Sequence, residues 1–203
     1  WGNVQPGQSV NYVECHDNLT LYDKLLASTK LSATDRTKVF QLTSSVPILA
    51  QGMPFIQAGQ EFLRSKQGND NSYQASDAIN SLKWNQRTKN MSTVNYFAGL
   101  FALRAAHPAF RMDSASAIRA NLKFVNQPRG VISYSLNGAA VGDSASTIFV
   151  AHNPNKVSVK LNLPSSSNWQ ILVKGDKAGT SSLGVVKGKS VSIAAYSTLV
   201  LTK

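Results

Sequence analysis

Cysteine is almost absent from this sequence, and its scarcity excludes two kinds of architecture. The 203 residues include a single cysteine, Cys15. One thiol forms no internal disulfide, and it cannot supply the several cysteines of a typical structural zinc site. Because a low cysteine content suits both the cytoplasm and the exterior of bacteria, it does not decide where the protein works.

Long hydrophobic runs and acidic residues are scarce as well. No apolar stretch approaches the roughly 20 residues that a membrane-spanning helix needs, so we predict no membrane span. The sequence has only 10 acidic residues but 21 basic ones, which gives a formal net charge of +11. The basic residues are scattered, so we predict no nucleic-acid partner. Loose attraction to an anionic surface such as a cell wall fits this charge better.

The first half of the sequence has the pattern of a strand, a helix and a second strand. A β-rich run covers 10–13, helical periodicity covers 31–50, and a short apolar run at 54–58 reads as a buried strand. This order predicts a crossover unit with two parallel strands. We interpret 18–24 as a loop, and we expect Pro47 to kink the helix or end it early.

A long polar segment and a second helix follow. Residues 60–91 are rich in Asn and Ser, and a loop of this length is usually functional or disordered. We expect four side chains to anchor it: Phe62, Tyr73, Leu82 and Trp84. The next helix is predicted to begin with a Ser92 cap and to stop at His107, which precedes a proline. We interpret His107 and His152 as structural residues.

The pattern changes after Met112, and we place a domain boundary there, between 1–112 and 113–203. Short segments now alternate apolar and polar residues, which is typical of strands with one buried and one wet face. Turn residues separate the segments, so we predict an antiparallel β-sandwich. The segments are 122–125, 131–136, 148–151, 157–163, 171–173, 191–193 and 199–201.

Ionisable side chains gather where the first strand ends, at Glu14, His16 and Asp17. Loops after strand ends often carry the chemistry of α/β folds. Metal binding is one interpretation, but strand alternation turns Glu14 and His16 away from Asp17. A Ser/His/Asp triad lacks a serine in a nucleophile-elbow pattern. The alternative without a catalytic role is that Asp17 is a loop carboxylate beside a structural histidine, His16.

A further interpretation makes Asp17 a carboxylate that faces a sugar ring. Glycoside hydrolysis passes through an oxocarbenium-like state, which negative charge and hydrogen bonds to ring hydroxyls stabilise. His16 would donate to a hydroxyl group. Tyr12, Tyr22 and Tyr73 would offer apolar platforms to sugar faces.

Four stretches of the sequence resemble a known family. Residues 10–25 (VNYVECHDNLTLYDKL) resemble the fourth conserved region of bacterial type I pullulanases, which are debranching enzymes of the α-amylase superfamily, glycoside hydrolase family 13. Residues 52–66 resemble the stretch that contains the eighth barrel strand, and 71–77 and 103–112 continue the match. The His-Asp pair is common to the whole superfamily, whereas the joined later stretches are typical of pullulanases.

The resemblance implies roles at the end of the first strand. Asp17 corresponds to the third family carboxylate, which stabilises the transition state by binding hydroxyls of the distorted sugar. His16 would bind the same sugar, and Asn18 lies beside them. Cys15 departs from the Ser or Ala expected there, and we interpret it as a small packed hydrophobe, with a reactive thiol as the alternative.

The resemblance also implies substrate contacts farther along the chain. Glu61 and Arg64 would shape the end of the eighth strand, and Arg64, Asn71 and Tyr73 would line the substrate cleft. For Glu61 a buried, paired carboxylate inside the barrel is the alternative.

The implied fold is the last strand–helix units of a TIM (β/α)8 barrel followed by a C-terminal antiparallel β-sandwich. The implied parent hydrolyses α-1,6 linkages of pullulan, starch or glycogen with retention. Its nucleophilic Asp and acid/base Glu would lie upstream of Trp1, so we expect the chain to be part of a longer protein and inactive alone. No cofactor is expected here; calcium would belong to the parent, with its site out of view.

The implied partners are an α-glucan polysaccharide and the upstream remainder of the barrel, with self-association of the isolated piece as a way to cover its open edge. A secreted or cell-surface bacterial location is favoured over the cytoplasm. A glycan- or cell-wall-binding module is the alternative function, which the 10 basic and 3 acidic residues after Met112 support. An isoamylase-type enzyme or an amylopullulanase is the alternative within the enzymes.

Overall fold

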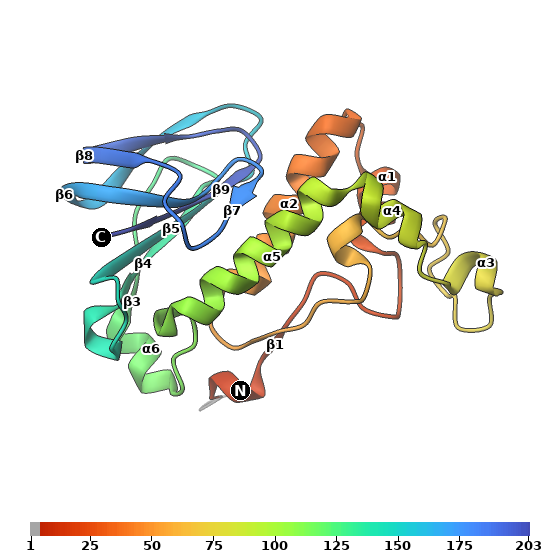
Figure 1. Ribbon diagram of the computed structural model, residues 1–203, viewed down its shortest axis with the longest axis horizontal. Helices are drawn as coiled ribbons and strands as arrows, with labels where there is room; N and C mark the ends of the chain where they lie inside the picture. The colour runs from red at the N-terminus through yellow and green to blue at the C-terminus, as the bar shows by residue number, and fades with distance from the viewer. Residues whose placement is uncertain (1–4) are drawn as a thin grey trace.

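The computed structural model describes residues 5–203, which form an antiparallel sheet, a pair of long helices packed on it, and a loop-rich region beyond the helices (Figure 1). The helices are α1 (Leu21–Ser28), α2 (Ala33–Leu49), α3 (Asp77–Asn80), α4 (Trp84–Lys89), α5 (Met91–Ala106) and α6 (Ala115–Asn121), with short 3-10 turns at Pro6–Gln8, Gln60–Phe62, Pro108–Phe110 and Ala139–Val141. The strands are β1 (Val10–Asn11), β2 (Met53–Pro54), β3 (Leu122–Phe124), β4 (Ile132–Asn137), β5 (Thr147–Asn153), β6 (Val159–Lys174), β7 (Lys177–Ala178), β8 (Val185–Ile193) and β9 (Ser197–Thr202). No helix within this described range has the length and apolar character to cross a membrane.

The predicted parallel crossover is confirmed, although its strands are short. β1 and β2 pair in parallel, with Val10 opposite Met53 and Asn11 opposite Pro54. The backbone N–H of Phe55 still donates to the Asn11 carbonyl at 2.9 Å, but 55–58 is not a strand, so that part of the prediction was wrong. The outer faces of Val10, Met53 and Phe55 are exposed, because no further strand flanks the pair in the described chain.

Two helices, α1 and α2, lie between these strands, and the first was predicted as a loop. Thr20 caps α1 by accepting a hydrogen bond from the N–H of Asp23 at 3.2 Å, and Leu21 and Leu25 are buried below it. A threonine followed three residues later by an acidic residue is an N-cap signal that the loop interpretation overlooked.

Pro47 does not end α2 early, which was one of the two outcomes predicted for it. The helix begins after a Ser32 cap and continues through Pro47 to Leu49. A proline that lies in the last turn removes one hydrogen bond near an end where helices fray anyway. The following turn closes normally, because the N–H of Ala50 donates to the Val46 carbonyl at 3.0 Å.

An antiparallel β-sandwich was predicted after Met112. The antiparallel strands are present, but they pair in a single seven-stranded sheet with order β3-β4-β5-β9-β6-β7 and β8 paired to β6. The predicted strands 157–163, from residue 159 on, and 171–173 belong to the single long β6, whose pairing shifts register near Asn162 and Ile171. Such bulges bend a strand, and they let the sheet curl around a core. Helix α6, just after Met112, was not expected in an all-β segment.

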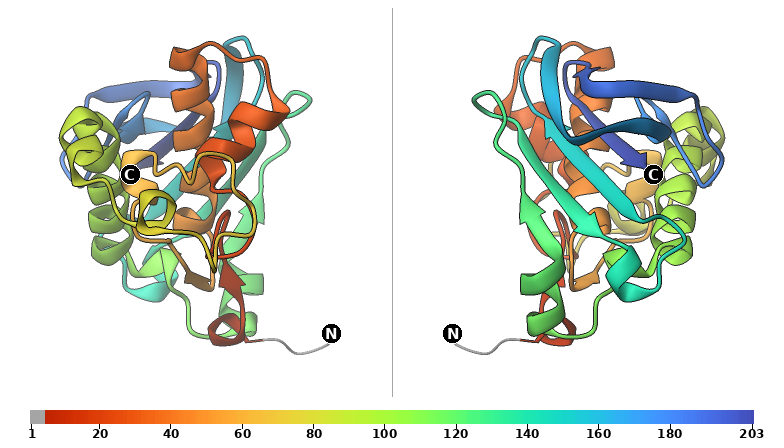
Figure 2. Two further views of the ribbon diagram at one scale, coloured as in Figure 1. Left: turned by 90° about the vertical axis from the view of Figure 1, so that its right-hand side faces the viewer. Right: turned by 90° about the vertical axis from the view of Figure 1, so that its left-hand side faces the viewer.

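Hydrophobic residues bury both faces of this sheet. One cluster, which includes Phe149, Trp169 and Leu201, fills the inside of the curled sheet. The other cluster joins Phe97 and Leu100 of α5 with Val200 and further residues of the sheet. Figures 1 and 2 show α2 and α5 lying along that face. The core is therefore continuous across Met112.

Candidate functional site

His16, Asp17 and Asn18 form the turn that follows β1 and precedes α1. His16 Nε2 lies 3.5 Å from Asp17 Oδ2, and the two side chains are 84% and 73% exposed. Asn18 has a left-handed backbone with φ of 62°, a conformation that asparagine tolerates better than most residues. The turn thus presents a carboxylate and an imidazole side by side to the solvent, where a polar ligand has access to both.

Glu14 is separated from this pair, because its side chain points inward and is 4% exposed. Its Oε2 accepts a hydrogen bond from the N–H of Leu21 at 2.6 Å, at the start of α1. Burial raises the pKa of Glu14 to about 7, against the opposing effect of the Leu21 N–H and of the positive charges of Arg64 and Lys66. Among residues 5–203 no three His, Cys, Asp or Glu side chains cluster as a metal site.

A buried lysine supports the turn from below. Lys66 Nζ donates to the His16 carbonyl at 3.1 Å and to Ser72 Oγ at 2.7 Å. The backbone N–H of Lys66 donates to Asp23 Oδ2 at 2.7 Å, and Ser65 Oγ donates to Asp23 Oδ1 at 2.6 Å. These bonds tie the turn to helix α1 and to the segment that follows Lys66.

Arg64 lies within the loop, and the hydrogen bonds of its side chain go to backbone carbonyls of that loop. Its guanidinium donates to the carbonyl of Ala58 at 3.3 Å and to the carbonyl of Asn80. Glu61 accepts a hydrogen bond from the N–H of Gly59 at 3.0 Å. Both side chains therefore bind backbone groups of the loop and hold its shape.

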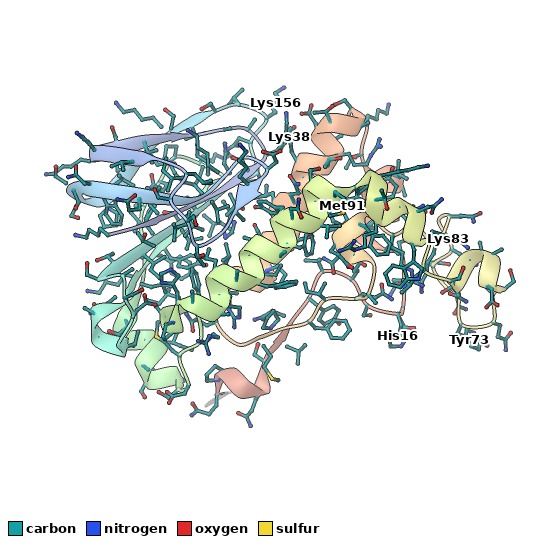
Figure 3. All side chains as sticks on the ribbon, viewed as in Figure 1. His16, Lys38, Tyr73, Lys83, Met91 and Lys156 are labelled. Carbon is teal, nitrogen blue, oxygen red and sulfur yellow. The ribbon has the colours of Figure 1, made fainter. Side chains whose placement is uncertain are left out.

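Asn71 and Tyr73 lie on an exposed stretch of the same loop, and the Tyr73 side chain is 77% exposed. Figure 3 shows His16 and Tyr73 at the end of the molecule that lies away from the sheet. Ser72 stands between Asn71 and Tyr73, so its hydrogen bond with Lys66 links this stretch to the His16 turn. Of the four predicted anchors, Phe62 is fully buried and Leu82 is half-buried. Trp84 is exposed but packs on Phe62 with ring centroids 5.9 Å apart, and Tyr73 is exposed.

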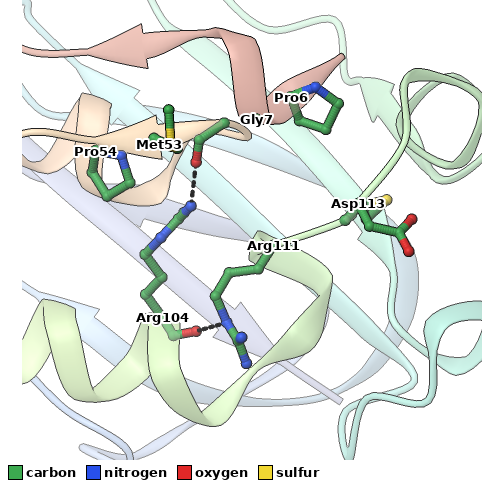
Figure 4. A pocket seen from close by; sticks show the side chains of 9 residues that line it. Pro6, Gly7, Met53, Pro54, Arg104, Arg111 and Asp113 are labelled. Atoms are coloured by element: carbon green, nitrogen blue, oxygen red, sulfur yellow. Dashed lines mark hydrogen bonds between the residues drawn. The ribbon is translucent and has the colours of Figure 1, made fainter.

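A cavity of about 660 Å³ lies elsewhere and contains none of the predicted site residues (Figure 4). Met53, Pro54 and two arginines belong to its lining. Arg104 donates to the Ala50 and Gly52 carbonyls at 2.7 and 2.6 Å. These bonds satisfy carbonyl groups at the end of α2, which gives Arg104 a structural role.

The two remaining histidines are structural in the sense predicted, since each is buried against a partner. His107 Nδ1 lies 2.7 Å from Asp143 Oδ1, and His152 Nδ1 lies 2.9 Å from Thr198 Oγ1. Burial lowers the pKa of His152 to about 4. Neither residue belongs to the exposed turn.

Residues that support the turn escaped the sequence analysis. Asp23, Lys66 and Ser72 carry no periodic signal, and charged or polar residues in a polar segment are normally solvated. Asp23 and Lys66 lie inside stretches 10–25 and 52–66, which offered the one available hint that they are special.

Comparisons with known proteins give a consistent result. The family model described as "Pullulanase, all-beta domain" matches residues 118–177. The pullulanase of Bacillus subtilis is 38% identical over 198 residues, which are 97% of this chain and 27% of the relative. The isoamylase of Pseudomonas amyloderamosa is 26% identical, over 81% of this chain and 27% of the relative.

Solved structures match over almost the whole chain. The pullulanase of Bacillus acidopullulyticus is 43% identical with a TM-score of 0.94, over 98% of this chain and 24% of that protein. The type I pullulanase of Bacillus subtilis, complexed with maltose, is 37% identical with a TM-score of 0.91, over 98% and 28%. The chain thus spans about a quarter of the length of the proteins it matches.

Proposed function

The chain is homologous to bacterial type I pullulanases over their C-terminal region, and from that premise we propose that it works as part of a debranching α-glucan hydrolase. Its parent cleaves α-1,6-glucosidic linkages in pullulan, starch or glycogen with retention. The observation that carries this proposal is the 43% identity and TM-score of 0.94 to a pullulanase over 98% of the chain.

In this proposal Asp17 stabilises the transition state. The sugar ring develops positive charge as the glycosidic bond breaks, and a carboxylate stabilises that charge far more than it stabilises the neutral ground state. His16 donates a hydrogen bond to a hydroxyl of the same sugar, and Asn18 borders it. The exposure of His16 and Asp17 supports this role, since a polysaccharide must reach both side chains.

Asn71 and Tyr73 would contact the glucan from the neighbouring loop. An exposed tyrosine ring offers an apolar face for a sugar, and its location near the His16 turn supports this contact. For Arg64 we propose an indirect contribution, because its guanidinium already donates to the carbonyls of Ala58 and Asn80.

The remaining parts of the reaction would come from upstream residues. A double displacement needs a nucleophile and an acid/base group besides Asp17. We propose that β1 and β2 complete a (β/α)8 barrel with upstream strands, that the boundary lies near Met112, and that 113–203 form its C-terminal β-sandwich. The exposed apolar side chains of Val10, Met53 and Phe55 support such a covering partner.

The proposed chemistry uses no cofactor, and calcium in the parent would lie in its upstream part. The described residues of this chain offer no cluster of metal-binding side chains that fits such an ion. The relatives compared above are bacterial, and a secreted or cell-surface location is part of the proposal. Self-association would be a property of the isolated piece, since among residues 5–203 no further strand pairs with β1 or β2.

A chimera tests the proposal. This chain replaces the matching C-terminal segment of the Bacillus subtilis pullulanase, and release of reducing ends from pullulan is measured. We expect hydrolysis by the chimera and none by the 203-residue chain alone. A folded chimera that binds pullulan without cleaving it would contradict the proposal and favour a glycan-binding module.

A further inference from the structure

We propose that Lys66 is a positioning residue that fixes the His16–Asp17 turn and the Asn71–Tyr73 stretch relative to each other. The inference rests on the proposed function, and it adds a residue that holds two parts of the glucan site in a fixed relative position. Lys66 itself would not touch the substrate, because its side chain is 4% exposed and its ammonium group is engaged below the turn.

The lysine spans two segments that are distant along the chain. Its ammonium group donates to the carbonyl of His16, 50 residues earlier, at 3.1 Å, and to Ser72 Oγ, six residues later, at 2.7 Å. Lysine is rarely buried, and a buried ammonium group is costly unless it is paired and hydrogen-bonded. The location of such a group between two exposed site segments points to a specific task.

The backbone of Lys66 is itself held in place by hydrogen bonds to α1. The N–H of Lys66 and the hydroxyl of Ser65 both donate to the carboxylate of Asp23, a buried residue of α1. Thr20 caps the same helix directly after the turn. Helix α1 therefore fixes the position of Lys66, and the hydrogen bond from its ammonium group in turn fixes the His16 carbonyl.

The far segment is fixed in the same manner. Ser72 accepts from Lys66 through its side chain, while its carbonyl accepts from Asn80 Nδ2 at 2.6 Å. Asn80 also donates to the Ala75 carbonyl at 3.0 Å, which closes the loop around Tyr73. One continuous network thus runs from α1 through Lys66 to both site segments.

Two substitutions in the chimera separate the two links. Ser72→Ala removes the link to the Tyr73 stretch and keeps the Lys66–His16 bond, so we expect KM to rise several-fold with little change in kcat. Lys66→Met also frees the carbonyl that precedes Asp17, so we expect kcat to fall roughly 10- to 100-fold, as small misplacements of catalytic groups do.

Lys83→Met is the matched control. Lys83 Nζ also binds a serine hydroxyl and a carbonyl, Ser81 Oγ at 2.6 Å and the Asp77 carbonyl at 3.3 Å, but both acceptors belong to its own segment. We expect this variant to keep the kcat and KM of the native chimera. If Lys66→Met and Ser72→Ala change the melting temperature alone, with native kcat and KM per folded molecule, the proposal is overturned.

Hydrogen exchange on the full 203-residue chain gives a second readout that does not need activity. In both Lys66→Met and Ser72→Ala we expect amides of 69–76 to exchange about tenfold faster, and in Lys66→Met those of 15–19 as well, with β5 and β9 unchanged. Because Ser72→Ala keeps the buried charge, it tests the link even where Lys66→Met does not fold. Unchanged exchange in both segments would overturn the positioning role, whereas an inactive native chimera with the expected exchange pattern would refute only the proposed function.

Discussion

Replacing Glu14 with glutamine should make the chain more stable at neutral and alkaline pH. The carboxyl group of Glu14 is buried, its Oε1 has no hydrogen-bond partner, and burial raises its pKa from 4.5 to about 7. A carboxylic acid that is harder to ionise in the folded state than in the unfolded state favours folding at low pH. That contribution is fully present below pH 4.5 and is lost as pH rises to about 7.

The magnitude follows from the two pKa values. The rise from 4.5 to about 7, at about 1.36 kcal/mol for each pKa unit, corresponds to about 3 kcal/mol of unfolding free energy. Glu14→Gln has no charge at any pH, and its side-chain oxygen still accepts the hydrogen bond from Leu21. The difference in stability between the variant and the native chain should therefore be small at pH 4 and approach roughly 3 kcal/mol at pH 8.

Urea unfolding measured at several pH values between 4 and 8 checks this expectation. Glu14→Met serves as the matched control, because it removes the charge and also the acceptor of the Leu21 N–H. Its pH dependence should parallel that of Glu14→Gln, with a constant offset of about 1 kcal/mol for the lost hydrogen bond. If the native chain and Glu14→Gln show the same pH dependence across this range, the buried-acid argument for Glu14 is wrong.

Three further predictions concern catalysis and stability. Asp17→Asn in the chimera should lower kcat on pullulan about 10²–10³-fold while leaving KM nearly unchanged, and a rise in KM alone would make Asp17 a binding residue. Burial alone would raise the pKa of Asp143, but hydrogen bonds from His107 and from backbone N–H groups outweigh it and hold the pKa below its ordinary value. Asp143→Asn should therefore lower the unfolding free energy by roughly 1–3 kcal/mol at pH 7, and this difference should shrink as acid protonates the native Asp143. Equal urea midpoints of the variant and the native chain at pH 7 would contradict this. Tyr134→Phe removes the 2.9 Å hydrogen bond to the Leu49 carbonyl and should lower the unfolding free energy by about 1–2 kcal/mol, which thermal unfolding would detect.

The local patterns of the sequence predicted the fold best where hydrophobic periodicity is strong. The parallel crossover and the antiparallel strands after Met112 follow from such periodicity, and both are present. The prediction failed where a single residue was weighed without its surroundings. Pro47 was expected to kink α2 or end it early, yet the helix continues past it to Leu49, in a last turn that the core holds in place.

The candidate site could be located from the sequence but not assembled. The exposed pair of His16 and Asp17 follows from the strand end and from the family motif, and their roles in a reaction stay predictions. The support below them depends on contacts between residues about 50 positions apart, such as Lys66 with the His16 carbonyl. No local pattern encodes such a contact, because a buried lysine and a solvated lysine look the same in one sequence.

The hydrophobic core shared by α5 and the sheet bears on how the chain unfolds and how it can be recombined. Residues on both sides of Met112 contribute to one cluster, and Ser45 of α2 is hydrogen-bonded to Thr198 of β9 at 2.6 Å. Separating the sheet from α2 and α5 would expose the apolar residues of this shared cluster to solvent. The helices and the sheet should therefore melt in one cooperative transition. A sheet exchanged between related enzymes should be tolerated when the donor's α2 and α5 travel with it.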